Sequence, residues 1–443
     1  MGKQVIIYVL GMSLLLGFAV TNLNKTTLGS SDLLSTYYAK STSRNIALSG
    51  ANIVTQLCLA DTTYRTNLRN QHLSGGTFDA TITPMGDSLK IQSVSHVSIR
   101  YYDNANSTWR TEASDTVEAI LSRLYFSEFG YFSESESFGY LSPTSNSIAN
   151  INTPVYKITG DSVFGPAHTN GRWNFSGSPY FNDLVTGGST PNYSGSGRPI
   201  FSKGSRWGIT YTRPSVRLDD MENAAASGGK LWTSSATGGQ DLGLQFSSNG
   251  QVRVRIPWNT GSIKDTTYAS LSGLAPNGVI GVKGIDVRVS GTYRGRATVF
   301  ARTTPTAGLK GNVWLQGDLV AANSPRTNPS STDMMGIVAE RMCYIATTGF
   351  SRNSSSEVYV DAAIYCQNGV LGVENYNTVA PSGRFNLYGG VAINAATVFG
   401  TFSGNRLLSG MIRSIRFDRR FSATSPPAFP FANKMRVKSW WQN

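Results

Sequence analysis

Charged residues are scarce in this chain of 443 residues: Asp, Glu, Lys and Arg together make up 15% of it. Cysteine and histidine are scarcer still, with three of each. Three cysteines are too few for a disulfide framework, and His72, His96 and His168 stand in unrelated contexts that offer little to a transition metal. The sequence also lacks the common motifs of metalloproteases, serine hydrolases, phosphate-binding loops and dinucleotide sites. We therefore expect no cofactor, no metal and no enzymatic activity.

Glycine and aromatic residues are abundant where charge is not. The chain has 46 Gly, 20 Tyr and 20 Phe, and it is rich in Ser, Thr and Asn. Aromatic and β-branched residues favour strands, and glycine favours tight turns. The composition predicts a mainly β protein.

Val5–Val20 is the chain's longest apolar stretch, and no charge lies between Lys3 and Lys25. At about 1.5 Å per residue a helix there spans roughly 30 Å, the thickness of a bilayer's hydrocarbon core. Its apolar members are Val5, Ile6, Ile7, Leu10, Leu14, Leu15, Leu16, Phe18 and Val20. Three alternatives fit this pattern: a retained signal anchor, a cleaved secretory signal, for which Ala19–Thr21 is a poor cleavage site, and a pilin-type helix. The retained anchor and the pilin-type helix make the inner membrane a partner.

Helical periodicity continues past Lys25. Apolar or small residues recur every three or four positions, which predicts a packing face on a helix that runs to about residue 60. The face consists of Ile46, Ala47, Gly50, Ala51, Ile53 and Val54. We expect Gly29–Asp32 to break or kink the helix before that face begins. The predicted helical segment is 1–60.

Two stretches on this helix resemble the minor pilins of type IV pili: Tyr38–Ser41, and Arg44–Ala51, which reads RNIALSGA. In that family an Arg-x-x-Ala-Leu-x-x-Ala segment precedes a β head on the same long helix. Two positions depart from the family: Lys3 follows Gly2, and Ile7 stands where these pilins carry a glutamate. The resemblance implies an envelope protein with its N-terminus in the inner membrane and its body in the periplasm or on the cell surface. It also implies pilin-like subunits or assembly machinery as partners.

A small β head is predicted for residues 61–148. Alternating apolar residues on both sides of Pro84–Asp87 predict a hairpin within 75–101. The segment 117–126, VEAILSRLYF, has helical spacing. The run from Ser133 to Ser147 reads as a loop between domains.

Residues 149–443 consist of short strands closed by turns, and later ones recur with a loose period. Segments that start at Val287, Val313, Ile337, Val358 and Phe385 lie 26, 24, 21 and 27 residues apart. This period favours a right-handed parallel β-helix, or solenoid, while a β-sandwich, with strands usually about 8–12 residues apart, remains the alternative.

One segment of residues 149–443 interrupts this period, and two cysteines lie within the periodic part. Residues 202–282 break it and are predicted to be an inserted decoration, with a helix at 218–226 and a hairpin at 242–256. Cys343 and Cys366 are expected in the interior as free thiols rather than as a disulfide.

The second part also resembles an uncharacterised β-solenoid-type domain of Gram-negative envelope proteins. The resemblance rests on short stretches that occur in the expected order: Phe164–Gly171, Ser178–Phe181, Arg416–Arg420, Pro426–Pro430 and Ser439–Trp441. It implies an envelope location and no known activity.

Two sets of polar residues are candidates for binding. Asp161, His168 and Asn170 surround a Gly-Pro turn and could line a polar pocket, although such residues also stabilise turns. The net charge of +13 includes a basic C-terminal group of Arg413, Arg416, Arg419, Arg420, Lys434, Arg436 and Lys438. That group could face lipopolysaccharide, phospholipid headgroups or nucleic acid, or could be a solvated edge.

The sequence thus favours a non-enzymatic, pilin-like subunit that is membrane-anchored or filament-associated and presents a β-solenoid for adhesion or assembly. Surface polysaccharide is a candidate ligand. The alternatives are a polysaccharide-acting β-helix enzyme, which needs two carboxylates about 5–10 Å apart in a groove, and a DNA-binding pilin-like protein, for which nucleic acid is the less favoured partner.

Overall fold

The computed structural model describes the chain except residues 1, 86–87, 100, 104–107, 126–128, 142–147, 212–216, 260, 262–263, 306–307, 348–356, 382, 397, 405, 423 and 443. The chain is mainly β and carries one long N-terminal helix. It forms two units, residues 1–124 together with 433–443, and residues 125–432.

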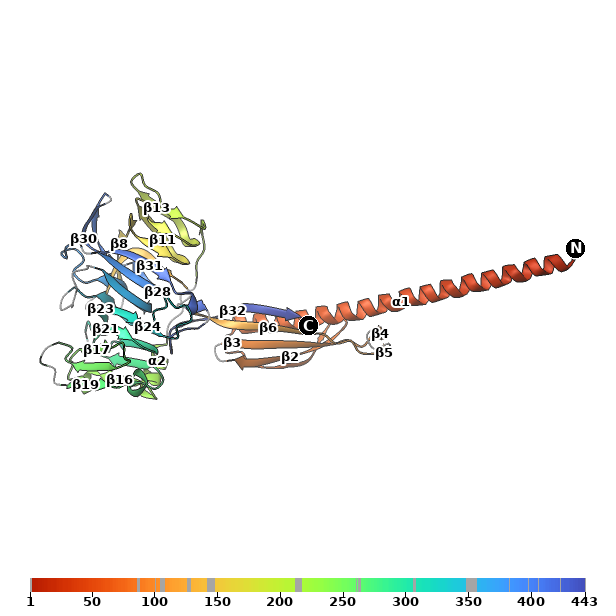
Figure 1. The fold of residues 1–443 in the computed structure, drawn as a ribbon, viewed down its shortest axis with the longest axis horizontal. Coiled ribbons are helices and arrows are strands. Elements are labelled where there is room, and N and C mark those ends of the chain that lie inside the picture. The colour runs from red at the N-terminus through yellow and green to blue at the C-terminus, as the bar shows by residue number, and fades with distance from the viewer. Residues whose placement is uncertain are drawn as a thin grey trace. The chain divides into compact units, whose positions relative to one another are not determined.

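The first unit is a helix packed against an antiparallel sheet (Figure 1). Its elements are α1 (Gly2–Ala60), β1 (Leu68–Leu73), β2 (Gly76–Met85), β3 (Ser88–His96), β4 (Tyr101–Asp103), β5 (Thr108–Arg110), β6 (Thr116–Tyr125) and β32 (Phe431–Gln442). The order across the sheet is β1-β2-β3-β6-β32. The predicted hairpin is confirmed as the antiparallel pair β2–β3.

Helix α1 is continuous, so the kink predicted at Gly29–Asp32 is wrong. The hydroxyls of Thr27 and Ser30 donate to the carbonyls of Leu23 and Thr26, one turn back. They therefore bond within the helix instead of ending it, and one glycine costs a helix only about 1 kcal/mol relative to alanine.

A helix is predicted at 117–126, but residues 117–125 belong to strand β6, and residue 126 lies outside the described part of the chain. Val117, Ala119 and Leu121 are fully buried, and the residues between them are half-buried. This alternation is that of a strand with one face on a core, and β6 pairs antiparallel with β3 along its length. Val117 and Leu121 are also four residues apart, which is why the same residues suggested a helix; strand pairing decided between the two.

The second unit is built mainly from parallel strand pairs. Its strands are β7 (Tyr131–Leu141), β8 (Ile148–Pro154), β9 (Lys157–Ile158), β10 (Ser162–Phe164), β11 (Ala167–Ser176), β12 (Tyr180–Phe181), β13 (Val185–Ser194), β14 (Ile200–Phe201), β15 (Ser205–Trp207), β16 (Lys230–Thr233), β17 (Leu242–Phe246), β18 (Val252–Ile256), β19 (Lys264–Tyr268), β20 (Val279–Lys283), β21 (Val287–Tyr293), β22 (Arg296–Arg302), β23 (Val313–Ala321), β24 (Met334–Ala339), β25 (Cys343–Ile345), β26 (Val358–Cys366), β27 (Leu371–Val373), β28 (Arg384–Ala396), β29 (Gly400–Ser403), β30 (Arg406–Gly410) and β31 (Ile412–Phe417). Its helices are α2 (Leu218–Ala226), α3 (Ser234–Thr237), α4 (Leu271–Leu274) and the 3-10 turn η2 (Arg419–Ser422).

Parallel ladders run through these strands. One connects β16, β20, β22, β24, β26 and β28 in that order, and another connects β17, β21, β23, β25 and β27. Val287 pairs with Val313, and Val358 with Phe385, as their spacing predicted. Ile337 lies on the same ladder as Val358 and Phe385, where it is opposite Ile364, whereas Val287 and Val313 lie on the other ladder. A right-handed parallel β-helix stays a prediction.

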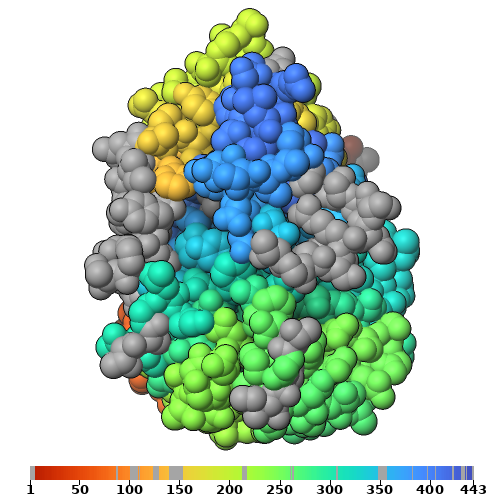
Figure 2. All heavy atoms as spheres, turned by 90° about the vertical axis from the view of Figure 1, so that its left-hand side faces the viewer, coloured from red at the N-terminus to blue at the C-terminus, as the bar shows by residue number. Residues whose placement is uncertain are grey.

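The first strands of the second unit stack on its last strands. Strand β28 pairs in parallel with both β31 and β7, and β31 pairs in parallel with β10. From there the ladders continue to β12 and β14, and to β11, β13 and β15. Strands β11–β13 and β16–β19 therefore occupy opposite ends of this unit, with the blue strands β28 and β31 between them (Figures 1 and 2).

The second unit is an insertion between two neighbouring strands of the first. The chain leaves the first unit after β6 and returns as β32, which is hydrogen-bonded beside β6. This division differs from the predicted ranges 61–148 and 149–443: the second unit begins at Tyr125, and the last eleven residues belong to the first. Strand pairing between chain ends gives no signal in local composition, so the sequence did not reveal the insertion.

Within the predicted decoration at 202–282, helix α2 and the β17–β18 hairpin are confirmed. Strands β16 and β17 nevertheless belong to the parallel ladders, so this region also forms one end of the stack. Cys343 and Cys366 are buried and form no disulfide, as predicted.

Gly50 lies where α1 packs tightly against its sheet. A Cβ at this position would lie 2.5 Å from both Phe78 Cδ2 and Ser93 Oγ, whereas one at Gly29 would meet nothing within 4 Å. We predict that Gly50→Val destabilises the first unit by about 1–3 kcal/mol, because the added atoms displace the buried Phe78 ring. Hydrogen–deuterium exchange of β2 and β3, measured on the full chain in detergent, should accelerate.

Gly29→Val is the matched control and should leave exchange in β2 and β3 unchanged. Equal protection of these strands in the two variants would contradict the assigned helix–sheet contact.

Candidate functional site

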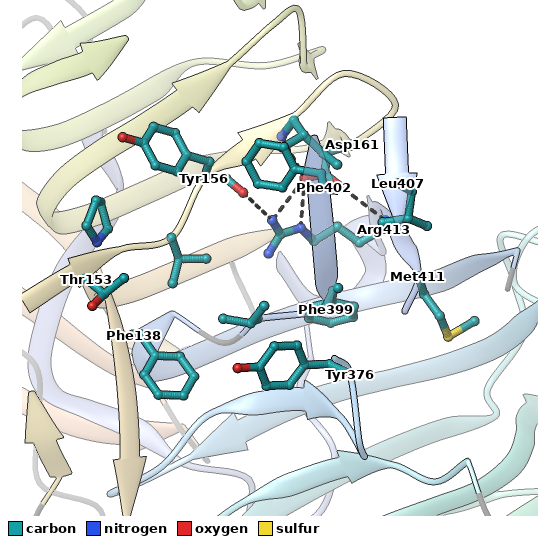
Figure 3. Close-up of a pocket in the computed structure, with 15 residues that line it drawn as sticks. Phe138, Thr153, Tyr156, Asp161, Tyr376, Phe399, Phe402, Leu407, Met411 and Arg413 are labelled. Atoms are coloured by element: carbon teal, nitrogen blue, oxygen red, sulfur yellow. Dashed lines mark hydrogen bonds and ion pairs between the residues drawn. The ribbon is translucent and has the colours of Figure 1, made fainter. Parts of the chain in front are cut away.

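A pocket of about 340 Å³ in the second unit is lined by five aromatic rings (Figure 3). The rings are Phe138 on β7, Tyr156 after β8, Tyr376 after β27, Phe399 after β28 and Phe402 on β29. Because these segments come from both ends of the second unit's chain, the pocket forms only when its first and last strands pair.

The pocket has a buried floor and a half-buried rim. Ile158, Phe399 and Met411 are 7%, 7% and 1% exposed, while the rings of Phe138, Tyr156, Tyr376 and Phe402 are half-buried. Two antiparallel strands, β29 and β30, contribute Phe402 and Leu407 to the rim. The shape suits a ligand whose apolar part enters between the rings.

An ion pair between Asp161 and Arg413 lies at the base of the pocket. Arg413 donates from Nε (3.1 Å) and Nη2 (2.9 Å) to Asp161 Oδ2, and from its backbone N–H to Oδ1 (3.1 Å). Nη2 also donates to the carbonyl of Tyr156 (3.1 Å). Burial disfavours the charged form of Arg413 and so lowers its pKa. The charge and hydrogen bonds of Asp161 act in the opposite direction, and the pKa of Arg413 is raised overall.

A second buried charge pair lies on strands that adjoin this site. Lys157 Nζ is 2.6 Å from Glu136 Oε2 and 3.0 Å from the Tyr131 hydroxyl, and it lies 4.4 Å and 5.3 Å from the ring centroids of Tyr131 and Trp173. Burial lowers the pKa of Lys157 to about 8, helped by the charge of Arg413, while Glu136 acts in the opposite direction. Burial raises the pKa of Tyr131.

The predicted polar cluster is split in the structure. Asp161 bonds Arg413, whereas His168 and Asn170 bond one another at 2.8 Å. His168 also contacts Thr186 Oγ1 at 2.7 Å, and burial lowers its pKa. Asn170 donates from Nδ2 to the carbonyl of Tyr211 and accepts from the Tyr211 N–H at Oδ1. His168 and Asn170 therefore stabilise the backbone at Tyr211, which is the structural role that such residues have at turns.

The predicted basic group is also divided. Arg413 and Arg420 are committed to Asp161 and Asp418, whereas Arg416 and Arg419 are exposed. Lys438 is exposed on β32, in the other unit, and the side chains of Lys434 and Arg436 lie outside the described part of the structure. The described side chains therefore do not form one free basic surface.

Helix α1 has two different halves. Val5, Ile6, Ile7, Leu10, Leu14, Leu15, Leu16, Phe18 and Val20 are each between 52% and 72% exposed. Ile46, Ala47, Gly50, Ala51 and Val54 are buried. Ile53 is 40% exposed, which corrects its place on the predicted packing face: it lies beside the buried stripe of 43, 46–47, 50–51, 54–55 and 58. By length and composition α1 could cross a membrane.

The described lining of the pocket carries few ionisable side chains. Asp161 is the one carboxylate among the described residues that line the pocket, and Arg413 occupies it. In the described part of the chain, no group of three His, Cys, Asp or Glu side chains could hold a metal ion. The sequence did not predict the pocket. The local hints of a buried site there were two lone charged residues in apolar surroundings: Lys157 beside Ile158, and Arg413 beside Ile412.

The Lys157–Glu136 pair generates a stability prediction. Lys157→Met should destabilise the second unit by about 3–5 kcal/mol at pH 7, because Glu136 is left as a buried charge without its partner. Lys203→Met, which removes an exposed ion pair to Asp183, should change stability by no more than about 0.5 kcal/mol. Urea unfolding of the full chain measures both; equal effects would contradict the assigned burial.

The pKa of Lys157 generates a pH prediction. Below about pH 8 the folded and unfolded states both hold this proton, and the cost of burying it is fully present. Between about pH 8 and 10.5 the folded state releases it first, so this group's contribution to stability rises with pH. The wild type should gain about 1–2 kcal/mol relative to the Lys157→Met/Glu136→Gln variant between pH 8 and 9.5.

The double variant serves as the reference because it lacks both charges but keeps Tyr131 and Cys343, whose raised pKa values act in the opposite direction at high pH. A constant difference between the two proteins over this range would contradict the lowered pKa.

Comparisons with known proteins do not assign this chain to a family. No model of a protein family matches the sequence, and neither does any curated protein. A crystal structure of the competence-associated pilin ComZ from Thermus thermophilus is similar at 15% identity, covering 93% of this chain and 97% of that one, with a TM-score of 0.38. Likeness at this level establishes neither a shared fold nor a shared function.

Proposed function

We propose that this chain is a pilin-like, non-enzymatic protein of the cell envelope, anchored in the inner membrane by α1. In this proposal the second unit is presented in the periplasm or on the cell surface, where it serves adhesion or assembly. Other pilin-like subunits or assembly machinery are its protein partners, and surface polysaccharide is a candidate ligand.

The observation that carries this proposal is the division of α1. Its apolar first part, through Val20, exposes large side chains on all faces, whereas its last part packs on an antiparallel sheet. In water such exposure is costly, and a lipid bilayer or a bundle of similar helices removes that cost. The pilin-like stretches Tyr38–Ser41 and Arg44–Ala51 lie on the same helix.

The parallel ladders support a solenoid as the presented domain. Alternate strands pair in parallel, and their buried residues are mainly apolar, which is the arrangement that solenoid coils require and an antiparallel sandwich lacks. We propose that these ladders are the coils of a right-handed parallel β-helix. Stacking then accounts for a large core at a low charge content.

The alternatives have less support. A glycoside-cleaving enzyme needs two carboxylates in its groove, and the described pocket lining offers Asp161 alone. DNA binding needs several free cations on one surface, and Arg413 and Arg420 are already paired.

Membrane fractionation tests the anchor. The full chain, expressed in a Gram-negative host, should stay in the inner-membrane pellet after a carbonate wash and be released by detergent. Leu14→Arg/Leu15→Arg should move it to the soluble fraction, because each arginine at the bilayer centre costs about 2.5–3.5 kcal/mol. Leu33→Arg/Leu34→Arg changes two equally exposed leucines beyond the apolar run and should leave fractionation unchanged.

A soluble wild-type chain, or membrane retention of the Leu14/Leu15 variant, would reject the anchor. Mass spectrometry of the N-terminus in sheared filaments and in membranes then tests filament membership. An intact Met1 found only in membranes would reject incorporation into a filament.

A further inference from the structure

We propose that the ring-lined pocket of the second unit is a binding site for a small aromatic compound that carries a carbonyl or carboxylate oxygen. This site does not depend on membrane anchoring, since its described lining lies within residues 125–432.

The pocket walls are rings from separate segments. Phe138 and Tyr376 lie 6.4 Å apart between ring centroids, and Tyr156 meets Phe402 edge-on at 6.3 Å. Aromatic rings attract one another in offset and edge-to-face arrangements, so a flat ring that enters this space finds favourable partners on several sides. Figure 3 shows the labelled rings around the opening.

One donor of a buried cation faces this space. Arg413 is 5% exposed and lines the pocket, and its Nε and Nη2 bind Asp161 and the Tyr156 carbonyl. Its remaining nitrogen, Nη1, has no hydrogen bond to a described residue and carries no dashed line in Figure 3. Because Nη1 is not fully buried, it can reach the pocket space, where an oxygen of a bound ligand would accept its hydrogen bond in place of water.

The position of this guanidinium is fixed before a ligand binds. Asp161 holds it in a fork, and the Phe399 ring lies 5.1 Å from its carbon. Because Asp161 neutralises the charge of the Arg413 guanidinium, the pocket offers directed hydrogen bonds rather than a strong positive electrostatic potential. It therefore fits a single acceptor oxygen and not a polyanion.

Size and polarity narrow the class further. A volume of about 340 Å³ accommodates a bicyclic ring with a short substituent. Besides the ion pair, the polar side chains among the described lining residues are Thr153, Tyr156 and Tyr376. A saccharide would bury more hydroxyl groups than these can satisfy.

Strand β30 offers a matched pair of positions. Leu407 lines the pocket, whereas the next residue, Leu408, is 50% exposed and is not part of the lining. Leu407→Trp fills the pocket, and Leu408→Trp adds the same side chain to the opposite side of one strand.

The test uses the full chain in detergent and saturation-transfer NMR with three probes: indole-3-acetate, 3-methylindole and methyl β-D-glucopyranoside. Indole-3-acetate should bind, and about tenfold more tightly than 3-methylindole, which has the ring without the acceptor. Leu407→Trp should abolish binding, and Leu408→Trp should not change it.

Three results would overturn the proposal. Equal affinity for the acid and for 3-methylindole would remove the role of Arg413. Equal binding by the two tryptophan variants would place the probe elsewhere on the chain. Preferential binding of the glucoside would make the pocket a sugar subsite.

Discussion

The buried ion pair of Asp161 and Arg413 marks the junction on which the second unit depends. Its members are 252 residues apart, and the strands beside them, β10 and β31, pair in parallel. Without this junction β10, β12 and β14 would lose the ladder on which they stack, whereas β7 pairs with β28 directly. Buried charges also penalise wrong partners more than apolar contacts do, because an unpaired charge in a core is costly. We infer that the pair fixes the register at which the two ends of this unit meet.

The same junction produces the pocket. Phe138 and Tyr156 arrive from the early strands, and Tyr376, Phe399 and Phe402 arrive from the late ones. A binding site at such a meeting point inherits its rigidity from the ladders on both sides, while the β29–β30 pair at its rim is bonded only to itself among the described strands. In the proposed binding site, a ligand would therefore contact a floor fixed by the ladders and a rim formed by the separate β29–β30 pair.

The first unit solves a different problem, the close approach of a helix to a sheet. Small residues at Ala47, Gly50 and Ala51 allow α1 to lie against β2 and β3. The sheet is completed by β32, which arrives only after the whole second unit has been made. Its completion thus requires the two ends of the inserted unit to lie close enough for β6 and β32 to pair, which couples the two units through chain connectivity.

Local pattern determined much of this protein. The uncharged run before Lys25, the helical stripe through Val54, the β2–β3 and β17–β18 hairpins and helix α2 follow from periodicity and turn residues, which act over a few positions. Tertiary pairing decided the rest. It made 117–125 a strand, stacked β7 on β28 and β10 on β31, and returned the last strand to the first unit. It also separated Asp161 from His168 and Asn170, and joined it to Arg413 and a ring of aromatics. Contacts between residues hundreds of positions apart have no periodic signature in the chain, so only the folded structure could reveal them.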